Sequence, residues 1–196
     1  MNGEDTAPKG FEKLWAPWRM KYIEEIDTGG EDACIFCDAP REGEDRKRYI
    51  VYRGNTCYCI MNIFPYNNGH LLVVPFHHTG ELDTLSAETR LELFDTADMV
   101  VHVMKNTMRP DGFNIGMNLG RSAGAGIASH LHLHIVPRWN GDTNFMPVIG
   151  GTKVISESLD DTYEKLTRAI GEDLSPGEGG EFSPDDVRSR LKREND

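Results

Sequence analysis

The sequence has no long hydrophobic run, and this absence excludes several kinds of protein. Nowhere do as many as about 18 apolar residues follow one another, so we expect no membrane-spanning helix. Residues 1–10 carry two acidic side chains and lack the apolar stretch of a secretory signal. Of the 196 residues, 38% are hydrophobic and 27% are charged, which suits one ordinary domain with a proper core. We therefore expect a cytoplasmic protein.

Basic residues are also scarce, because 21 of them stand against 32 acidic residues and give a net charge of −11. Such an acidic total argues against a protein that coats nucleic acids. The deficit lies in the two flanks, since residues 46–155 hold 10 basic and 8 acidic residues. All seven histidines also lie in this central segment. The centre of the chain is therefore suited to a compact anionic ligand, and neither a nucleic acid nor a membrane is expected as a partner.

Cysteine is limited to four residues, which fall into two close pairs. Cys34 and Cys37 form a Cys-x-x-Cys pair, and such a pair in a cytoplasmic chain favours metal binding or redox chemistry over a structural disulfide. Cys57 and Cys59 stand two apart in a strand-like segment. We expect these two thiols to pack in the core as small hydrophobic side chains.

Alternating and periodic patterns predict an α+β fold. Short links between strand-like runs favour antiparallel neighbours, so we expect a mainly antiparallel sheet with one long helix packed on one face. That helix would begin after a capping serine, Ser86. The expected strands are residues 49–52, 56–63, 70–75, 113–119 and 129–136, and the expected helix is 86–108. The apolar stripe of this helix would consist of Leu91, Phe94, Ala97, Val101, Met104 and Met108.

Most of the chain is expected to form a single domain, residues 11–170. It would include an aromatic arm at 11–22, whose two tryptophans must pack on the body or on a partner subunit, and a last helix within 152–170. Residues 27–33 and 38–48, rich in glycine and charge, are predicted to be loops. Residues 1–10 are predicted to be a flexible tail, and residues 171–196 a mostly flexible acidic tail.

Three histidines alternate with apolar residues near position 130. His130, His132 and His134 would share one face of a strand, while the leucines between them would face the core. Imidazoles in a row either bind a metal, or one of them acts as a nucleophile while its neighbours hold an anion. A loop of small residues at 120–126, which contains Arg121, precedes this strand and is suited to bring backbone N–H groups close to a phosphate.

The run His-Leu-His-Leu-His-Ile-Val at 130–136 resembles the signature of the histidine triad (HIT) family. A matching segment, Gly-His-Leu-Leu-Val-Val-Pro at 69–75, lies upstream. The resemblance implies a HIT-like fold and a nucleotidyl-histidine intermediate. By the same resemblance, His132 would be the nucleophile, with its other ring nitrogen fixed by a backbone carbonyl, and His134 and His70 would bond the phosphate.

The resemblance also implies contacts to the nucleotide. Asn118 would hold a phosphate oxygen or the ribose. Asn62 lies where many members carry an acidic residue on the ribose hydroxyls. The family's usual hydroxyl or amide side chain on the leaving group has no clean counterpart here, and backbone N–H groups of the preceding loop would take its place. The loop residues concerned are Gly124, Gly126 and Ser129.

Some branches of the family hold a structural zinc ion, and this sequence resembles them. The resemblance implies a closed Cys₂His₂ set consisting of Cys34, Cys37, His78 and His130. His77 is the adjacent rival of His78, and strand alternation would allow only one of them to serve. Zinc is the only cofactor expected, and no organic cofactor is implied. A metal-centred catalytic site on the three histidines is the alternative.

Three further segments resemble the diadenosine polyphosphate phosphorylase branch of the family, namely residues 15–19, 61–70 and 137–145. This likeness implies cleavage of a dinucleoside polyphosphate, such as diadenosine tetraphosphate, with orthophosphate as the acceptor. The expected partners are thus an adenine nucleotide or dinucleoside polyphosphate, orthophosphate and a second copy of the chain in a homodimer. The alternatives are a hydrolase or nucleoside phosphoramidase of the same family, and a module that binds nucleotides without turnover.

Overall fold

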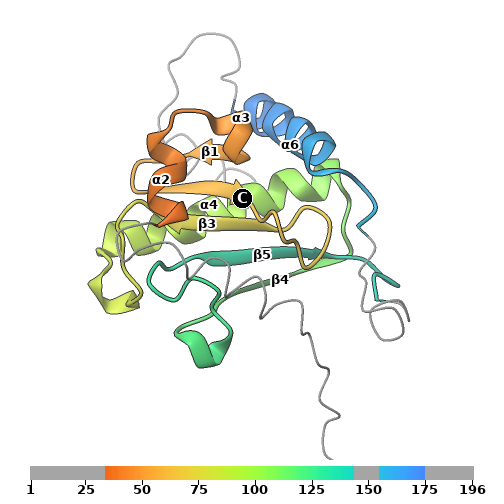
Figure 1. Ribbon diagram of the computed structural model, residues 1–196. Helices are drawn as coiled ribbons and strands as arrows, with labels where there is room; N and C mark the ends of the chain where they lie inside the picture. The colour runs from red at the N-terminus through yellow and green to blue at the C-terminus, as the bar shows by residue number, and fades with distance from the viewer. Residues whose placement is uncertain (1–33, 144–154, 175–196) are drawn as a thin grey trace, which may run out of the picture.

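Five antiparallel strands form one sheet in the computed structural model, which describes residues 34–143 and 155–174. The strands are β1 (Ile50–Arg53), β2 (Cys57–Met61), β3 (Leu71–Pro75), β4 (Gly112–Met117) and β5 (Leu133–Arg138), and their order in the sheet is β1-β2-β3-β5-β4 (Figure 1). All five strands lie within or beside the predicted runs. The last one begins only at Leu133, so both His130 and His132 precede the strand proper.

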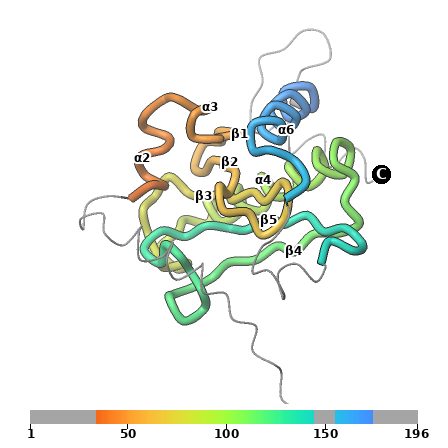
Figure 2. Tube along the Cα trace, turned by 45° about the vertical axis from the view of Figure 1, so that its right-hand side comes forward, coloured from red at the N-terminus to blue at the C-terminus, as the bar shows by residue number. Residues whose placement is uncertain are grey.

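The two faces of the sheet carry different helices. Along β2, Cys57, Cys59 and Met61 belong to a core cluster shared with α4 (Ala87–Thr107) and α6 (Leu159–Leu174). Tyr58 and Ile60 point to the opposite face, where they pack against α2 (Ile35–Arg41). Figures 1 and 2 show α2 and α4 on opposite sides of the strands. The expected α+β architecture and the core position of the two strand cysteines are therefore confirmed.

The long helix α4 is confirmed, but its predicted apolar stripe is partly wrong. Ser86 caps the helix by accepting a hydrogen bond from the N–H of Thr89 at 3.0 Å. Leu91 and Phe94 are 46% and 60% exposed. The packed stripe instead runs along Leu93, Ala97, Val100 and Met104. The middle of the helix is apolar on more than one side, so periodicity alone did not identify the face that the sheet covers.

Residues 38–48 were predicted to be a loop, and this prediction is wrong. They hold the end of α2 and the short helix α3 (Asp45–Arg48). Pro40 lies inside α2 and therefore provides no N–H for the carbonyl of Phe36, four residues earlier. The hydroxyl of Tyr58 donates to that carbonyl at 2.7 Å instead. Contact with the sheet, rather than local propensity, holds this helix in place.

The last helix, α6, starts later than predicted and continues to Leu174, four residues into the segment expected to be a tail. Short 3₁₀ turns at Leu82–Thr84 and Arg121–Ala123 complete the elements. The predicted N-terminal tail, the aromatic arm and residues 175–196 lie outside the described residues. Within the described residues, no helix combines the length and the apolar character needed to cross a bilayer.

Candidate active site

His132 is placed as a nucleophile would be. Its Nδ1 lies 2.8 Å from the carbonyl oxygen of His130, so Nδ1 carries the proton and donates to that oxygen. Nε2 therefore keeps its lone pair. Burial lowers the pKa of His132, which favours the neutral, nucleophilic form of the ring. The ring of Phe36 packs against the imidazole with centroids 5.0 Å apart. The backbone carbonyl predicted to set the tautomer is thus that of His130.

His70 and His134 form a buried pair beside His132. Nε2 of His70 lies 2.9 Å from Nδ1 of His134, and the rings of His132 and His134 are 4.8 Å apart between centroids. The pair joins two neighbouring strands, because Leu72 of β3 and His134 of β5 are register partners. The leucines that alternate with the histidines face the α4 side, so the imidazoles lie on the α2 side of the sheet. The structure therefore brings His70, His132 and His134 together.

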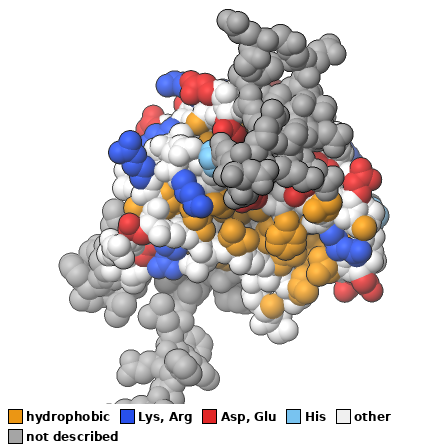
Figure 3. All heavy atoms as spheres, turned by 180° about the vertical axis from the view of Figure 1, so that it is seen from behind, with side chains coloured by type: hydrophobic (Ala, Val, Ile, Leu, Met, Phe, Trp, Pro, Cys, Tyr) orange, Lys and Arg blue, Asp and Glu red, His pale blue; other side chains and the backbone are white. Residues whose placement is uncertain are grey.

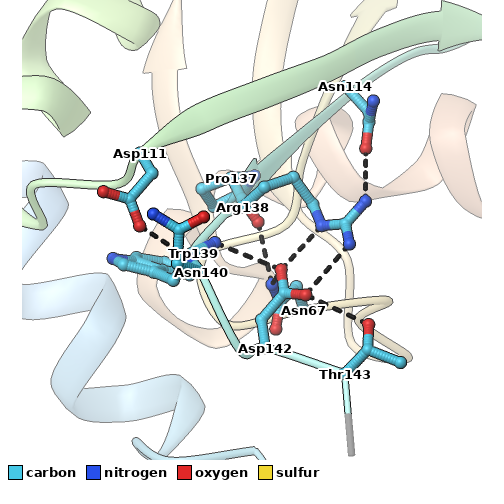
Figure 4. A network of polar contacts seen from close by, with 9 residues as sticks. All are labelled: Asn67, Asp111, Asn114, Pro137, Arg138, Trp139, Asn140, Asp142 and Thr143. Atoms are coloured by element: carbon cyan, nitrogen blue, oxygen red, sulfur yellow. Dashed lines mark hydrogen bonds and ion pairs between the residues drawn. The ribbon is translucent and has the colours of Figure 1, made fainter.

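The turn that carries His70 is fastened to the end of β5. The buried side chain of Asn67 donates through Nδ2 to the carbonyl of Pro137 at 2.9 Å and to Oδ2 of Asp142 at 2.8 Å. Arg138 binds the same carboxylate through Nε at 2.6 Å and Nη2 at 2.9 Å, as Figure 4 shows. This ion pair and hydrogen bonds hold the pKa of Asp142 well below its usual range. The carboxylate thus stays charged and fixes the turn.

The four predicted metal ligands form a separate cluster next to the alternating histidines. Sγ of Cys34 lies 3.3 Å from Nδ1 of His130, and Sγ of Cys37 lies 3.3 Å from Nδ1 of His78 and 3.6 Å from Nδ1 of His130. All four ligand atoms lie within 4.8 Å of one another. Ligands about 2.0–2.3 Å from a tetrahedral zinc ion are separated by roughly 3.3–3.8 Å, and the three sulfur–nitrogen distances of 3.3–3.6 Å fall in this range.

The surroundings of this cluster suit a metal as well. Nε2 of His130 donates to the carbonyl of Pro75 at 2.8 Å, which leaves Nδ1 to face the sulfur atoms. Burial lowers the pKa of His130 to about 4, so the ring is neutral at pH 7 and able to ligate. His77 has no place in the cluster, and His78 does. Of the three alternating histidines only His130 belongs to it, which favours the division between one ligand and two reacting residues.

A largely apolar pocket of about 260 Å³ opens beside the histidines, and the sequence interpretation missed it. Asn62 belongs to its wall and also lies 3.3 Å from Nδ1 of His70, so the pocket ends close to the histidine pair. Its size and apolar walls suit a flat heterocycle. The apolar side chains that line it are Ile35, Phe36, Ala39, Ile60, Met61, Ile63 and Leu72.

The predicted phosphate loop has a shape suited to its role. Gly120 and Gly124 have φ angles of 77° and 90°, which glycine adopts without strain. Asn118 Nδ2 lies 3.5 Å from the carbonyl oxygen of Gly124. Ser129 is exposed and Gly126 is half-buried. The nucleotide contacts expected of this loop remain predictions.

Comparison with known proteins decides the family. The HIT domain family model matches residues 44–141, which include all three alternating histidines and His70. The chain belongs to the HIT family. A relative described as an AP-4-A phosphorylase, from Mycobacterium tuberculosis, is 43% identical over 162 residues, which cover 80% of this chain and 83% of the relative. The predicted membership and the likeness to the diadenosine polyphosphate phosphorylase branch are confirmed, and the chain is an enzyme of the HIT family.

Solved structures of HIT proteins share the fold. A zinc-bound histidine triad family protein from Mycobacterium smegmatis has a TM-score of 0.59 and 26% identity, and the match covers 73% of this chain and 96% of that one. A histidine triad nucleotide-binding protein from Sulfolobus tokodaii has a TM-score of 0.56 and 31% identity, with coverage of 71% and 90%. The HIT fold expected from the sequence is therefore confirmed.

Two HIT site residues escaped the sequence interpretation. Phe36 lies between the two cysteines predicted to bind a metal, and its apolar character between two charged segments was the signal that it packs inward. Tyr66 donates its backbone N–H to Nδ1 of His70 at 3.0 Å, and its ring stacks on His134 with centroids 5.7 Å apart. A backbone donor leaves no mark in the side-chain pattern, so this second contact had no sequence signal.

Proposed function

We propose that this HIT enzyme cleaves dinucleoside polyphosphates such as diadenosine tetraphosphate by way of an adenylyl group carried on His132. Nε2 of His132 attacks the α-phosphorus with its lone pair, and the bond from that phosphorus to the bridging oxygen breaks with its electrons on the leaving ATP. Orthophosphate then attacks the same phosphorus, the N–P bond breaks, and ADP leaves. The products of one turnover are ADP and ATP.

The single observation that carries this proposal is the state of His132. Its Nδ1 proton is committed to the carbonyl of His130, so Nε2 is the nitrogen left to react. The His70–His134 pair beside it supplies an N–H donor, on His134, for the phosphate oxygens, whose charge must be stabilised during transfer. The apolar pocket lined in part by Asn62 would take the adenine, with the ribose between the base and the histidines. The phosphorylase relative supports the choice of substrate.

Product analysis tests the proposal. Purified protein is mixed with diadenosine tetraphosphate, with and without orthophosphate. We expect ADP and ATP when orthophosphate is present. AMP and ATP in both conditions would make the enzyme a hydrolase, and the absence of any product would overturn the proposal.

Two histidine variants separate the nucleophile from the fold. His132→Gly should lose turnover by at least about 10³-fold and regain part of it with free imidazole, which fills the vacated space and attacks in place of the ring. His102→Ala is the matched control, because His102 lies on α4, where its Nε2 is 3.3 Å from Nδ2 of Asn106 and 3.9 Å from Oδ1 of Asp173 among the described residues. Equal losses of turnover in the two variants would show that His132 is not the nucleophile.

We also propose that Cys34, Cys37, His78 and His130 hold a structural zinc ion. The close spacing of the four ligand atoms and the zinc-bound HIT neighbour support this assignment. The ion would join α2 to the residue two positions before His132, and the closed ligand set would leave it no open coordination site for substrate. Metal analysis should find about one zinc per chain. Less than about a tenth of an equivalent in protein purified without chelator would exclude the site.

We propose, finally, that two copies pair through the surface formed by α4 and β4. β4 is an edge strand of the sheet, and Ile115 on it and Leu91 and Phe94 on α4 are exposed. Figure 3 shows apolar side chains gathered on the face seen from behind. Sedimentation should give a dimer for the wild type and a monomer for Phe94→Glu. Lys105→Gln changes the net charge by the same one unit near the end of α4 and should stay dimeric. A monomeric wild type would refute the pairing.

A further inference from the structure

Both polar atoms of the Asn62 side chain form hydrogen bonds with neighbouring residues. Its Oδ1 accepts the backbone N–H of Phe64 at 2.9 Å, which fixes the orientation of the amide. Its Nδ2 then faces Nδ1 of His70 at 3.3 Å. An amide nitrogen only donates, so Nδ1 of His70 must be the acceptor of this contact.

A second donor also requires Nδ1 of His70 to be an acceptor. The backbone N–H of Tyr66 points to the same Nδ1 at 3.0 Å. With Nδ1 accepting from two donors, the proton of the neutral ring must lie on Nε2. Nε2 of His70 lies 2.9 Å from Nδ1 of His134 and donates to it. The proton of neutral His134 therefore lies on its Nε2, on the side of the ring away from His70.

We infer that Asn62 is a positioning residue that sets the tautomers of both histidines. Through His70 it makes Nε2–H of His134 a donor toward the transferred phosphate. This inference deepens the proposed function, since the use of that donor depends on phosphoryl transfer, whereas the two tautomers do not. An aspartate at position 62 would be nearly the same size and would still accept from Phe64, but it would present an acceptor to His70. His70 would then take a proton on Nδ1, and that proton would oppose the N–H of Tyr66.

Nitrogen-15 NMR of the histidine rings tests the tautomers without substrate. In the full-length wild type, Nδ1 of His70 and of His134 should show the shift of an unprotonated ring nitrogen, and Nε2 of each that of a protonated one. In Asn62→Asp, Nδ1 of His70 should move to the protonated shift. A protonated Nδ1 on His70 in the wild type would overturn the inference, even if the variant failed to fold. Unchanged His70 shifts in a folded Asn62→Asp would overturn it too.

Kinetics with diadenosine tetraphosphate separate positioning from ribose binding. Asn62→Asp should lower kcat by about 10-fold or more while KM changes little, since a carboxylate still bonds ribose hydroxyls. A raised KM with unchanged kcat would show a substrate contact only and would overturn the positioning role. Asn106→Asp is the matched control, because Nδ2 of Asn106 lies 3.3 Å from Nε2 of His102 on the exposed side of α4. Its kcat should equal that of the wild type. If neither the wild type nor any variant turns over diadenosine tetraphosphate while the nitrogen-15 shifts are as expected, the proposed function is wrong. The inferred tautomers of His70 and His134 would still be correct.

Discussion

Replacing Tyr58 with phenylalanine removes one buried hydrogen bond and leaves the ring packing of the sheet unchanged. Tyr58 is fully buried, and its hydroxyl donates to the carbonyl of Phe36 at 2.7 Å. Burial raises the pKa of this phenol, so it stays protonated and remains a donor. Pro40 lacks the N–H that would otherwise reach the same carbonyl along α2. In Tyr58→Phe the carbonyl of Phe36 loses a partner that the helix cannot replace.

The expected cost follows from that loss. A buried carbonyl deprived of its donor costs about 1–3 kcal/mol of the free energy of unfolding. For a chain of this size, each kcal/mol lowers Tm by about 2–4 °C. Because α2 carries Phe36 and Cys37, the same change should loosen the wall of the apolar pocket and raise KM for the nucleotide.

Equilibrium unfolding in urea, with equal zinc content in both proteins, measures the effect. The midpoint should fall while the slope stays unchanged, because the surface exposed on unfolding is the same. Tyr49→Phe is the matched control. Its hydroxyl donates to Asp160 at 3.2 Å in an exposed position, so its loss should cost less than about 1 kcal/mol. Equal midpoints for Tyr58→Phe and Tyr49→Phe would refute the reasoning from Pro40.

Three other perturbations have defined outcomes. Gly80→Ala should lower the free energy of unfolding by about 1–3 kcal/mol, since an added Cβ would lie 2.5 Å from the carbonyl oxygen of Ala128. Gly116→Ala, whose Cβ would meet nothing within 4 Å, is its comparison in urea, and equal midpoints would contradict the clash. Ser86→Ala should lower the free energy of unfolding by about 1 kcal/mol, because it removes the cap of α4. Replacement of the exposed Ser122 by alanine should lower it far less. Thermal unfolding measures both, and equal Tm values for the two variants would contradict the capping role. A zinc chelator should lower Tm and open Cys34 and Cys37 to a thiol reagent while the buried Cys57 and Cys59 stay protected, and an unchanged melt would argue against a structural metal.

The sequence predicted the parts of the molecule that depend on a strict period. Alternation at His130, His132 and His134 placed the imidazoles on one face, because successive side chains of an extended chain point to opposite sides. The same rule placed Cys57 and Cys59 in the core. The ligand set at Cys34, Cys37, His78 and His130 came from the family resemblance, and the structure brings those four residues together.

Features that depend on tertiary contact were not predictable in this way. α2 contains a proline and two charged residues, and its helical form relies on Phe36 and Ala39 packing against the sheet. The apolar pocket draws on residues from α2, β2 and β3, which no local window contains together. Leu91 and Phe94 fit a helical period but point away from the sheet, because hydrophobicity does not say which neighbour covers a face.

β5 lies between β3 and β4 in the sheet. The chain should therefore tolerate the deletion of a residue in the turn before β5 but not within the segment that leads into and forms this strand. The histidines and leucines of residues 130–134, which lead into and begin this strand, occupy opposite faces, so a deletion of one residue within 130–136 would exchange them and destroy the reactive face and the core at once. Residues 121–123, by contrast, form an exposed turn before the strand. A scan of single-residue deletions should therefore find an abrupt boundary a few residues before His130. Deletions on one side of it should leave a folded, active enzyme, and deletions on the other should abolish folding and activity.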